Sequence, residues 1–459
     1  MKFIHDAYQP DETIAAVATA PGEGGVAIIR ICGKQALKVA QKVFSGSISS
    51  YKTHTVHYGN IVNIHGQHID DVLLIPMLAP RSYTGEDTIE IHCHGGNLIT
   101  RRVLDAVLTA GARQARPGEF TFKAFMNGRI DLSQAEAVQE LISAKNERAL
   151  DAAEKQLQGN LSKKILSFQN KLTHIGAILE AFVDFPEEGL EFASVSDVCK
   201  DLKNLTDEMQ ALADTFHDGK IVHDGISLCL AGAPNVGKSS IMNALLDKDR
   251  AIVSPIAGTT RDVLEDYLRL NGLNIKLMDT AGIRTTNEEI EQEGIRRSEM
   301  AMSSADIILL VLDAAKGLDQ LDLHLIDRLP PEKTVAIWNK MDLKGVGPLP
   351  TLSTPHVVKL SALEKTGFDG LRQTIDAVVW KNGPPDRDET LITNVRHKEA
   401  LLKCIDSCLL LNHGLTSDVS PEFLSLDMRH ALQSLGSILG TDITEDILSA
   451  IFSKFCIGK

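Results

Sequence analysis

A glycine-rich segment that ends in a lysine and a serine, GAPNVGKS at residues 232 to 239, is the strongest chemical signal in the sequence. It follows a short apolar run at residues 226 to 230 and opens a helical run through residues 241 to 246. Glycines in such a loop let backbone N–H groups turn toward phosphates at the positive end of a helix. Lys238 can then reach the β- and γ-phosphate oxygens, and Ser239 can offer its hydroxyl to Mg²⁺. The segment predicts a phosphate-binding loop in which Lys238 is catalytic.

Two segments downstream carry groups that can sense a γ-phosphate. GTTRD at residues 258 to 262 supplies Thr260, which is suited to bind Mg²⁺, and precedes a hairpin whose expected turn is Asn271-Gly272. The second strand of this hairpin ends in DTAG at residues 279 to 282. There Asp279 can hold the Mg²⁺ shell and the Gly282 N–H can contact the γ-phosphate. The order of both segments would depend on the nucleotide, as expected of a molecular switch.

The choice of base rests on NKMD at residues 339 to 342. Asp342 can accept hydrogen bonds from the ring N–H and the exocyclic amine of guanine, whereas adenine offers neither donor in that arrangement. This favours GTP and argues against a P-loop kinase or ATPase. SAL at residues 361 to 363 has the sequence of a loop that donates a backbone N–H to the guanine carbonyl. The predicted GTP-binding residues are Asn235, Val236, Gly237, Lys238, Ser239, Ser240, Ser254, Thr259, Thr260, Asp279, Thr280, Ala281, Gly282, Asn339, Lys340, Asp342, Ser361 and Ala362.

Two parts of a hydrolytic mechanism are left open by the residues alone. Ile283 follows DTAG, where Ras-like switches have a glutamine that orients the attacking water, and an apolar side chain cannot take that role. A member of the acidic tract at residues 288 to 293 could orient the water, or this tract could be a solvated loop. Charge on the phosphates must be offset by a separate arginine or by another cation. A monovalent cation held by Asn235 and by carbonyls near residues 254 to 259 could take the place of the arginine.

The elements that must position these residues predict several domains. At 459 residues the chain exceeds what one core usually supports, so two to four domains of roughly 100 to 200 residues are expected. Patterning predicts an α+β domain at residues 1–125, a helical segment at 126–218, a Ras-like doubly wound α/β domain at 219–382 and a second helical segment at 383–459. Packing of the two helical segments against each other would make the α/β domain an insertion within one helical domain.

Composition limits the location and the partners of the protein. The longest apolar stretch, at residues 305 to 314, is about half a membrane span, and acidic residues near the N-terminus argue against a signal or transit peptide. Seven scattered cysteines suit a reducing compartment, so we expect a cytoplasmic protein without a membrane partner. A net charge of −14 argues against broad nucleic-acid affinity. The arginines at positions 101, 102, 113 and 116 could still form a local basic surface, or be solvated charges.

Motifs along the whole chain resemble those of the MnmE (TrmE) family of tRNA-modification GTPases. They are PGEGGVAIIRICG, TGEDTIEIHCHGG, ARPGEFTFKAFMNGRIDLSQAEAV, GAPNVGKSS, AGTTRD, DTAGIR, NKMD and the terminal CIGK. The motifs outside the nucleotide-binding region are the more specific ones, because many switch proteins share the others.

The resemblance implies a task and a set of ligands. The protein would work with the FAD-containing partner MnmG, in a heterotetramer or larger complex, to install an aminomethyl-type group on carbon 5 of wobble uridine in certain tRNAs. Its N-terminal domain would dimerise and bind 5-formyltetrahydrofolate or a related folate through Arg30, Glu90, Arg129 and Lys459. Potassium would bind Asn235, Ser254, Ile256 and Thr259, Mg²⁺ would bind Ser239 and Thr260, and Glu291 would orient the water as a catalytic residue. The alternative is a ribosome-assembly or signalling switch without a chemical role.

Overall fold

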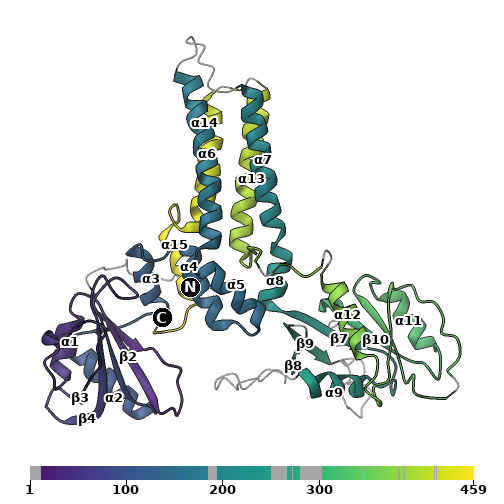
Figure 1. Cartoon of the computed structure of the whole chain (residues 1–459), viewed down its shortest axis with the longest axis horizontal. Coiled ribbons are helices and arrows are strands. Elements are labelled where there is room, and N and C mark those ends of the chain that lie inside the picture. Colours follow the sequence, from purple (N-terminus) through teal and green to yellow (C-terminus); the bar gives the residue numbers. More distant parts are fainter. Residues whose placement is uncertain are drawn as a thin grey trace, which may run out of the picture. The chain divides into compact units, whose positions relative to one another are not determined.

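The computed structural model describes residues 12–184, 194–249, 266–270, 272–279, 302–344, 346–380, 383–386, 388–417, 419 and 421–458. The chain divides into two compact units. The first comprises Met1–Gln139, Gln156–Thr206 and Lys403–Lys459, and the second comprises Glu140–Lys155 and Asp207–Leu402. Figure 1 labels many of the elements of both units, which are described separately below.

The first unit begins with a six-stranded sheet of order β3-β4-β5-β2-β1-β6. Neighbouring strands run antiparallel, except that β1 and β6 are parallel. Two helices and a 3₁₀ turn accompany the sheet, and apolar side chains of both helices and of the sheet form one core. The elements are β1 (Ile14–Val17), β2 (Val26–Cys32), α1 (Ala36–Val43), η1 (Ile48–Ser50), β3 (His57–Val62), β4 (His68–Met77), β5 (Thr88–His94), α2 (Asn97–Thr109) and β6 (Arg113–Gln114). The predicted α+β class is confirmed.

The opposite face of this sheet carries a mixture of polar and apolar side chains. Cross-strand partners share a face of a sheet. Arg30 lies opposite Glu90, Leu73 lies opposite His92, and Tyr58 lies opposite Leu73. Because Glu90 and His92 are two residues apart on β5, all five side chains share this face. We call it the open face, since Tyr58 and Leu73 are 72% and 43% exposed.

Helix α3 (Glu119–Met126) covers part of the open face. Its Phe120 is buried in a small cluster with Ile14, Ala16, Cys32 and Ala115. One turn later Lys123 is fully buried, and its Nζ donates to Glu86 Oε2 at 2.8 Å and to the Glu12 carbonyl at 3.1 Å. A buried ammonium is tolerated only where acceptors of this kind replace water.

The segments at residues 132–224 and 395–452 are mostly helical. In the first unit α6 and α14 lie side by side, and a Cβ added at Gly176 would lie 3.4 Å from Met428 Cγ (Figure 1). Segments before and after the nucleotide-binding domain therefore pack together, which confirms the predicted insertion. The helices are α4 (Leu132–Ser143), α5 (Glu147–Leu157), α6 (Asn160–Asp184), α7 (Val195–Asp214), α8 (Phe216–Asp224), α13 (Val395–Thr416), α14 (Pro421–Leu439) and α15 (Glu445–Phe452).

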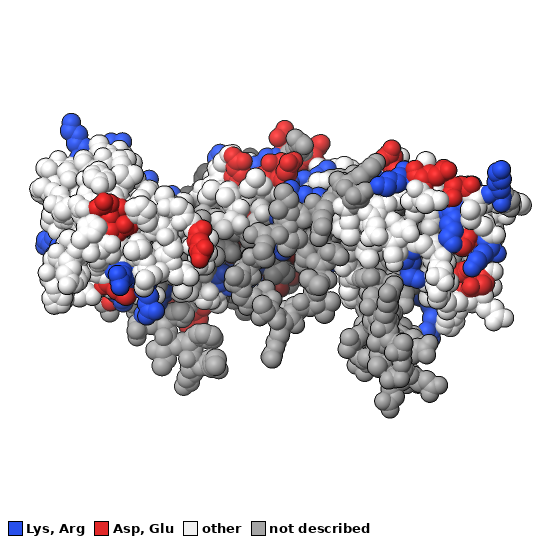
Figure 2. Space-filling view, turned by 90° about the horizontal axis from the view of Figure 1, so that it is seen from below, with Lys and Arg blue, Asp and Glu red and all other residues white. Residues whose placement is uncertain are grey.

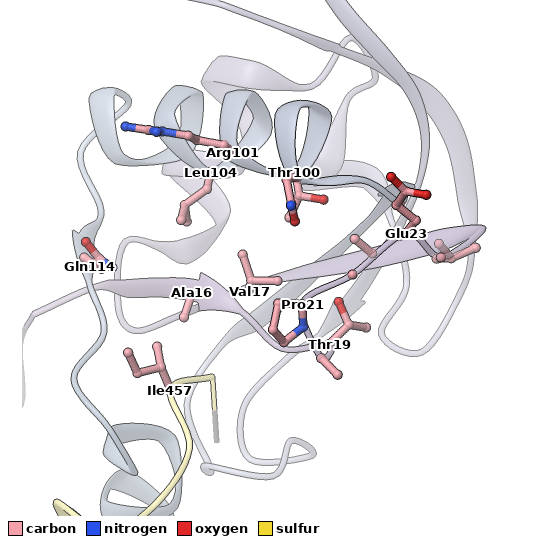
Figure 3. A pocket seen from close by; sticks show the side chains of 17 residues that line it. Ala16, Val17, Thr19, Pro21, Glu23, Thr100, Arg101, Leu104, Gln114 and Ile457 are labelled. Atoms are coloured by element: carbon pink, nitrogen blue, oxygen red, sulfur yellow. The ribbon is translucent and has the colours of Figure 1, made fainter. Parts of the chain in front are cut away.

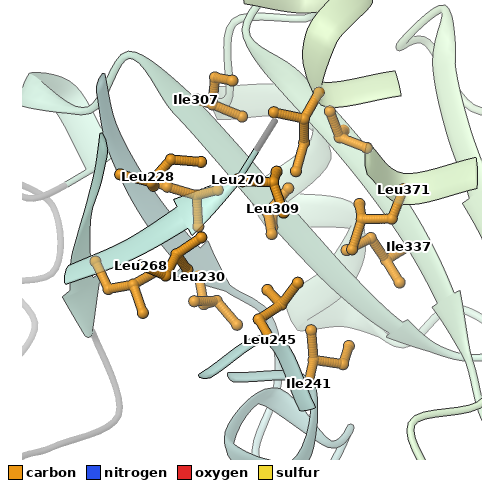
Figure 4. Packing of buried hydrophobic residues seen from close by; sticks show 14 of the residues in the cluster. Leu228, Leu230, Ile241, Leu245, Leu268, Leu270, Ile307, Leu309, Ile337 and Leu371 are labelled. Carbon is orange, nitrogen blue, oxygen red and sulfur yellow. The ribbon is translucent and has the colours of Figure 1, made fainter. Parts of the chain in front are cut away.

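The second unit contains a sheet of order β12-β11-β10-β7-β9-β8. Paired strands are parallel except for the hairpin of β8 and β9, whose register joins Leu270 to Leu273. Asn271 of the predicted Asn271-Gly272 turn lies outside the described residues. Apolar clusters cover both faces, and Figure 4 shows the one that includes Leu230, Leu309 and Ile337. The elements are β7 (Ile226–Ala231), α9 (Lys238–Asp249), β8 (Asp266–Leu270), β9 (Leu273–Asp279), β10 (Ile307–Asp313), α11 (Gln320–Arg328), β11 (Thr334–Asn339), β12 (His356–Lys359) and α12 (Phe368–Val379).

The long apolar stretch at residues 305 to 314 supplies β10, inside this sheet. Every residue of the strand is buried. Among the described residues, no helix is both long enough and apolar enough to cross a membrane. The stretch is therefore a core strand, as its interruption by acidic residues predicts.

Replacing Lys123 by methionine should destabilise the first unit by about 3–5 kcal/mol, because Glu86 would keep a largely buried charge without its cation. Urea unfolding followed by circular dichroism measures the change. Lys38→Met, which removes an exposed lysine on α1, serves as the control and should change stability by less than about 0.5 kcal/mol. If the Lys123→Met protein is as stable as the unmodified one, the ion pair between Lys123 and Glu86 does not contribute to stability.

Candidate active site

The phosphate loop joins β7 to α9. At the start of α9, Lys238 Nζ donates to the carbonyls of Gly232 at 2.7 Å and Ala233 at 2.8 Å. Gly232 has φ 134°, and a Cβ there would lie 2.3 Å from the Val311 carbonyl oxygen, so only glycine fits. Ser239 is exposed in the first turn of α9, where backbone N–H groups attract anions. The loop thus curls around its own lysine and presents the predicted Mg²⁺ ligand to solvent.

Two consecutive residues at the end of β11 hold the phosphate loop by its carbonyls. Asn339 Nδ2 donates to the Val236 carbonyl at 2.9 Å, and Lys340 Nζ donates to the Asn235 carbonyl at 2.9 Å. A Cβ at Gly237 would lie 2.2 Å from Asn339 Nδ2, so this approach also depends on glycine. The base-recognition motif and the phosphate loop therefore form one hydrogen-bonded structure.

A cavity of about 940 Å³ lies beside this structure. Ser361 Oγ donates to Asp342 Oδ1 and orients that carboxylate, while the Ala362 N–H donates to Asn339 Oδ1 at 3.0 Å. Six of the predicted nucleotide-binding residues line the cavity, namely Gly237, Ser240, Asn339, Lys340, Asp342 and Ala362. Its position beside both motifs suits the base and ribose of a guanine nucleotide.

Several predicted residues lie outside the described part of the chain. They are Ser254, Ile256, Thr259, Thr260, Thr280, Ala281, Gly282, Glu291 and Lys459. Asp279 ends β9, and its backbone pairs with Leu230 at the end of β7. DTAG therefore starts at the sheet edge from which the phosphate loop emerges, as expected for a γ-phosphate sensor.

Asp313, at the end of β10, belongs to this site although the motifs do not include it. Its side chain is 5% exposed and accepts from Lys340 Nζ at 2.6 Å and from the Ala315 N–H at 3.0 Å. Burial opposes the charged form, but the Lys340 ammonium and nearby backbone N–H groups outweigh it and lower the pKa of Asp313. In the sequence, Asp313 could have been recognised only by its position as a carboxylate at the end of a run of six apolar residues.

In the first unit, two of the predicted folate-binding residues form a pair on the open face. Arg30 Nε donates to Glu90 Oε1 at 2.9 Å, and Arg30 Nη1 donates to the Gly458 carbonyl at 3.3 Å. The guanidinium lies over the Phe120 ring, 5.6 Å from its centroid. The carbonyl of Gly458 brings the C-terminal CIGK segment to this pair.

Arg129 lies at the loop of residues 82–87, which also approaches Arg30. A Cβ added at Gly85 would lie 3.4 Å from the Arg129 side chain. In the same loop the Tyr83 hydroxyl donates to Thr121 Oγ1 at 3.1 Å. Partial burial raises the pKa of Tyr83, while the hydrogen bond to Thr121 and the charge of Arg30 act in the opposite direction. The loop of residues 82–87 therefore lies near both Arg30 and Arg129.

Comparison with known proteins places this arrangement in a family. The family model described as the MnmE helical domain matches residues 132–456, and that of the GTP-binding protein TrmE N-terminus matches residues 13–129. The tRNA modification GTPase MnmE of Protochlamydia amoebophila (strain UWE25) is 66% identical over 459 residues, which is 100% of both chains. The chain belongs to the MnmE family. The MnmE of Clostridioides difficile (strain 630) is 42% identical over 98% of this chain and 99% of its own.

Solved structures align with a smaller part of this MnmE-family chain. Era of Aquifex aeolicus, bound to GDP and aluminium fluoride, matches 40% of this chain and 67% of its own at 24% identity. The TM-score of 0.26 is too low to add to the family assignment.

A second cavity, of about 570 Å³, lies in the first unit of this MnmE-family chain. Figure 3 shows Thr100, Arg101 and Leu104 of α2 on one side, with Val17 on β1 and Ile457 of the C-terminal segment facing them. None of Arg30, Glu90 and Arg129 is among its described lining residues. The glycine-rich motif that begins with PGEGG at residues 21 to 25 contributes residues 21 to 24 to the lining.

Two of the four arginines that could have formed a basic surface lie near carboxylates. Arg113 bonds Glu12 at 2.7 Å and Glu119 at 2.5 Å, and Arg101 lies 3.9 Å from Asp105. Figure 2 shows acidic and basic side chains interspersed on the side in view, without a continuous basic area over the described residues. Of the two alternatives left open by the sequence, a solvated charge fits Arg101, whose side chain is 81% exposed, whereas Arg113 is paired and partly buried.

Replacing Gly237 by alanine should weaken GTP binding about tenfold or more. The left-handed backbone costs a residue with a Cβ about 1–2 kcal/mol, and the methyl group would displace Asn339 from Val236. Titration with a fluorescent GTP analogue measures the affinity. Gly347→Ala is a matched control, because a Cβ there meets no atom within 4 Å. Unchanged affinity in Gly237→Ala would contradict the assigned role of the Asn339 contact.

Proposed function

We propose that this chain is a potassium-activated GTPase that works with an FAD-containing partner. Together they add a (carboxymethyl)aminomethyl group to carbon 5 of the wobble uridine in certain tRNAs. The observation that carries the proposal is the presence, in one chain of the MnmE family, of a guanine-type cavity beside a phosphate loop and of the Arg30–Glu90 pair on an N-terminal sheet.

Hydrolysis begins with an exchange of partners at Lys238. Its ammonium leaves the carbonyls of Gly232 and Ala233 and binds the β- and γ-phosphate oxygens, where it offsets the charge that develops on bond cleavage. Ser239 and Thr260 hold Mg²⁺, which neutralises the same phosphates when bound. Glu291 orients the attacking water, the role that Ile283 cannot fill.

Asn235 has the chemistry of a potassium ligand. Its backbone carbonyl accepts from Lys340, and within the described part of the chain its exposed carboxamide makes no hydrogen bond. A neutral amide oxygen beside the phosphates suits a weakly hydrated monovalent cation, which supplies positive charge where other GTPases use an arginine. Ser254, Ile256 and Thr259 complete the proposed set.

The Arg30–Glu90 pair suits a folate. A pterin ring presents the same adjacent N–H and amine donors that Asp342 reads in guanine, and the Glu90 carboxylate can accept both. Arg30, Arg129 and Lys459 supply positive charge for the carboxylates of the glutamate tail. Glu90 is 14% exposed and lies on the open face, with Arg30 on Oε1 and His92 Nε2 at 3.3 Å from Oε2. A ligand that uses both oxygens would displace both side chains.

The open face also supports the proposed homodimer. Val26, Tyr58 and Leu73 are 60%, 72% and 43% exposed, and β-sheet pairing places them on the same side as Arg30. Burial of such apolar side chains against a second copy stabilises a dimer. The dimer would join two copies of the FAD-containing partner in a heterotetramer or larger complex, act on tRNA and work in the cytoplasm.

A strain that lacks this gene should contain tRNA without the modified wobble uridine. Mass spectrometry of nucleosides from digested tRNA measures the loss, and a plasmid copy of the gene should restore the modification. Unaltered nucleosides would contradict the proposed task and would favour a ribosome-assembly or signalling switch.

Hydrolysis of GTP should be at least about tenfold faster in potassium chloride than in sodium chloride, because the cation offsets charge on the phosphates. Asn235→Ala should remove most of this difference. Asn170→Ala, which truncates an exposed asparagine on α6, is the matched control and should retain it. Equal rates for the unmodified protein in the two salts would refute the cation proposal.

A further inference from the structure

Through Lys340, Asp313 is connected to Asn235 of the phosphate loop. Asp313 itself is not among the described residues that line the nucleotide cavity, whereas Lys340 is. Lys340 Nζ lies between two acceptors, Asp313 Oδ2 at 2.6 Å and the Asn235 carbonyl at 2.9 Å. The second Asp313 oxygen accepts from the Ala315 N–H at 3.0 Å, so the carboxylate cannot rotate without losing a bond.

Asn235 and Lys340, which are joined by the hydrogen bond from Lys340 Nζ to the Asn235 carbonyl, both have unusual backbones. Asn235 has φ 64° and Lys340 has φ 65°, which is the left-handed region that residues with a Cβ rarely adopt. Such conformations persist only where surrounding contacts hold them. The contact between Lys340 and the Asn235 carbonyl is one such contact, and Asp313 fixes the lysine that makes it.

We propose that Asp313 is a positioning residue that holds Lys340 against the carbonyl of Asn235 and thereby keeps the Asn235 carboxamide in place to bind potassium. The role rests on the potassium dependence in the proposed function. It extends that function from the residues of the phosphate loop to the end of β10. A neutral side chain of the same size would fill the same space in the core but would not hold the ammonium as firmly, because hydrogen bonds between charged groups are the stronger ones.

The test is a potassium titration of Asp313→Asn that does not depend on turnover. The full-length protein is mixed with Mg²⁺, aluminium fluoride and the fluorescent N-methylanthraniloyl derivative of GDP, which together imitate the transition state. Fluorescence is then followed as potassium chloride replaces sodium chloride. We expect the half-saturating potassium concentration to rise about tenfold, as the loss of one charge-assisted hydrogen bond would produce, with the final signal unchanged.

Two further variants keep the result interpretable. Asp306→Asn removes a carboxylate just before the other end of β10, where it bonds Ser227, and should leave the potassium midpoint unchanged. If Asp313→Asn does not fold, Asp313→Ser removes the same charge and keeps an oxygen that can accept from Ala315. It should raise the midpoint by a similar factor.

The outcomes separate this role from the proposed function. An unmodified protein without a potassium-dependent signal would overturn the cation proposal, and the role of Asp313 with it. If the unmodified protein responds to potassium and a folded Asp313 variant has the same midpoint, only the role of Asp313 would be overturned. A lower final signal at an unchanged midpoint would mean that Asp313 merely supports the fold, and would also overturn it.

Discussion

Two hydrogen bonds join the NKMD motif to the phosphate loop. Asn339 donates to the Val236 carbonyl, and Lys340 donates to the Asn235 carbonyl. They form because β10 lies between β7 and β11 in a parallel sheet, in a register that pairs Asp313 with Asn339. The apolar clusters on both faces support this register, because a slip by one residue would exchange closely packed side chains of different shape between the two clusters. The geometry of the nucleotide site is therefore a consequence of how the core packs.

In the first unit, a different contact holds the carboxylate of the proposed folate site. A carboxylate that can read adjacent N–H and amine donors is held by a loop hydroxyl in Asp342, and by an arginine in Glu90. Ser361 bonds Oδ1 of Asp342 and leaves Oδ2 for a ligand. Arg30 bonds Oε1 of Glu90, so it must move before a ligand can bind that oxygen. The carboxylate of Glu90 is thus held by a salt bridge, and that of Asp342 by a hydroxyl hydrogen bond.

Local sequence predicted most of the fold, because glycine spacing, turn residues and apolar periodicity act over a few residues. The phosphate loop, the β8–β9 hairpin, the parallel strands and the insertion between packing helices were all readable in this way. Asp313 was not, because its partner Lys340 is 27 positions away and only the strand register brings the two together. The cavity lined by Val17, Arg101 and Ile457 has the same origin, since its walls come from opposite ends of the sequence. The switch residues from Ser254 to Thr260 and Glu291 remain predictions.

The position of Lys238 has a consequence for how the protein returns to its starting state. Because its ammonium can bond the Gly232 and Ala233 carbonyls, departure of a nucleotide does not strand an unpaired cation in the loop. Each charged hydrogen bond of this kind is worth roughly 1.5–3 kcal/mol. The same backbone that forms the phosphate loop therefore supplies alternative acceptors for its own lysine.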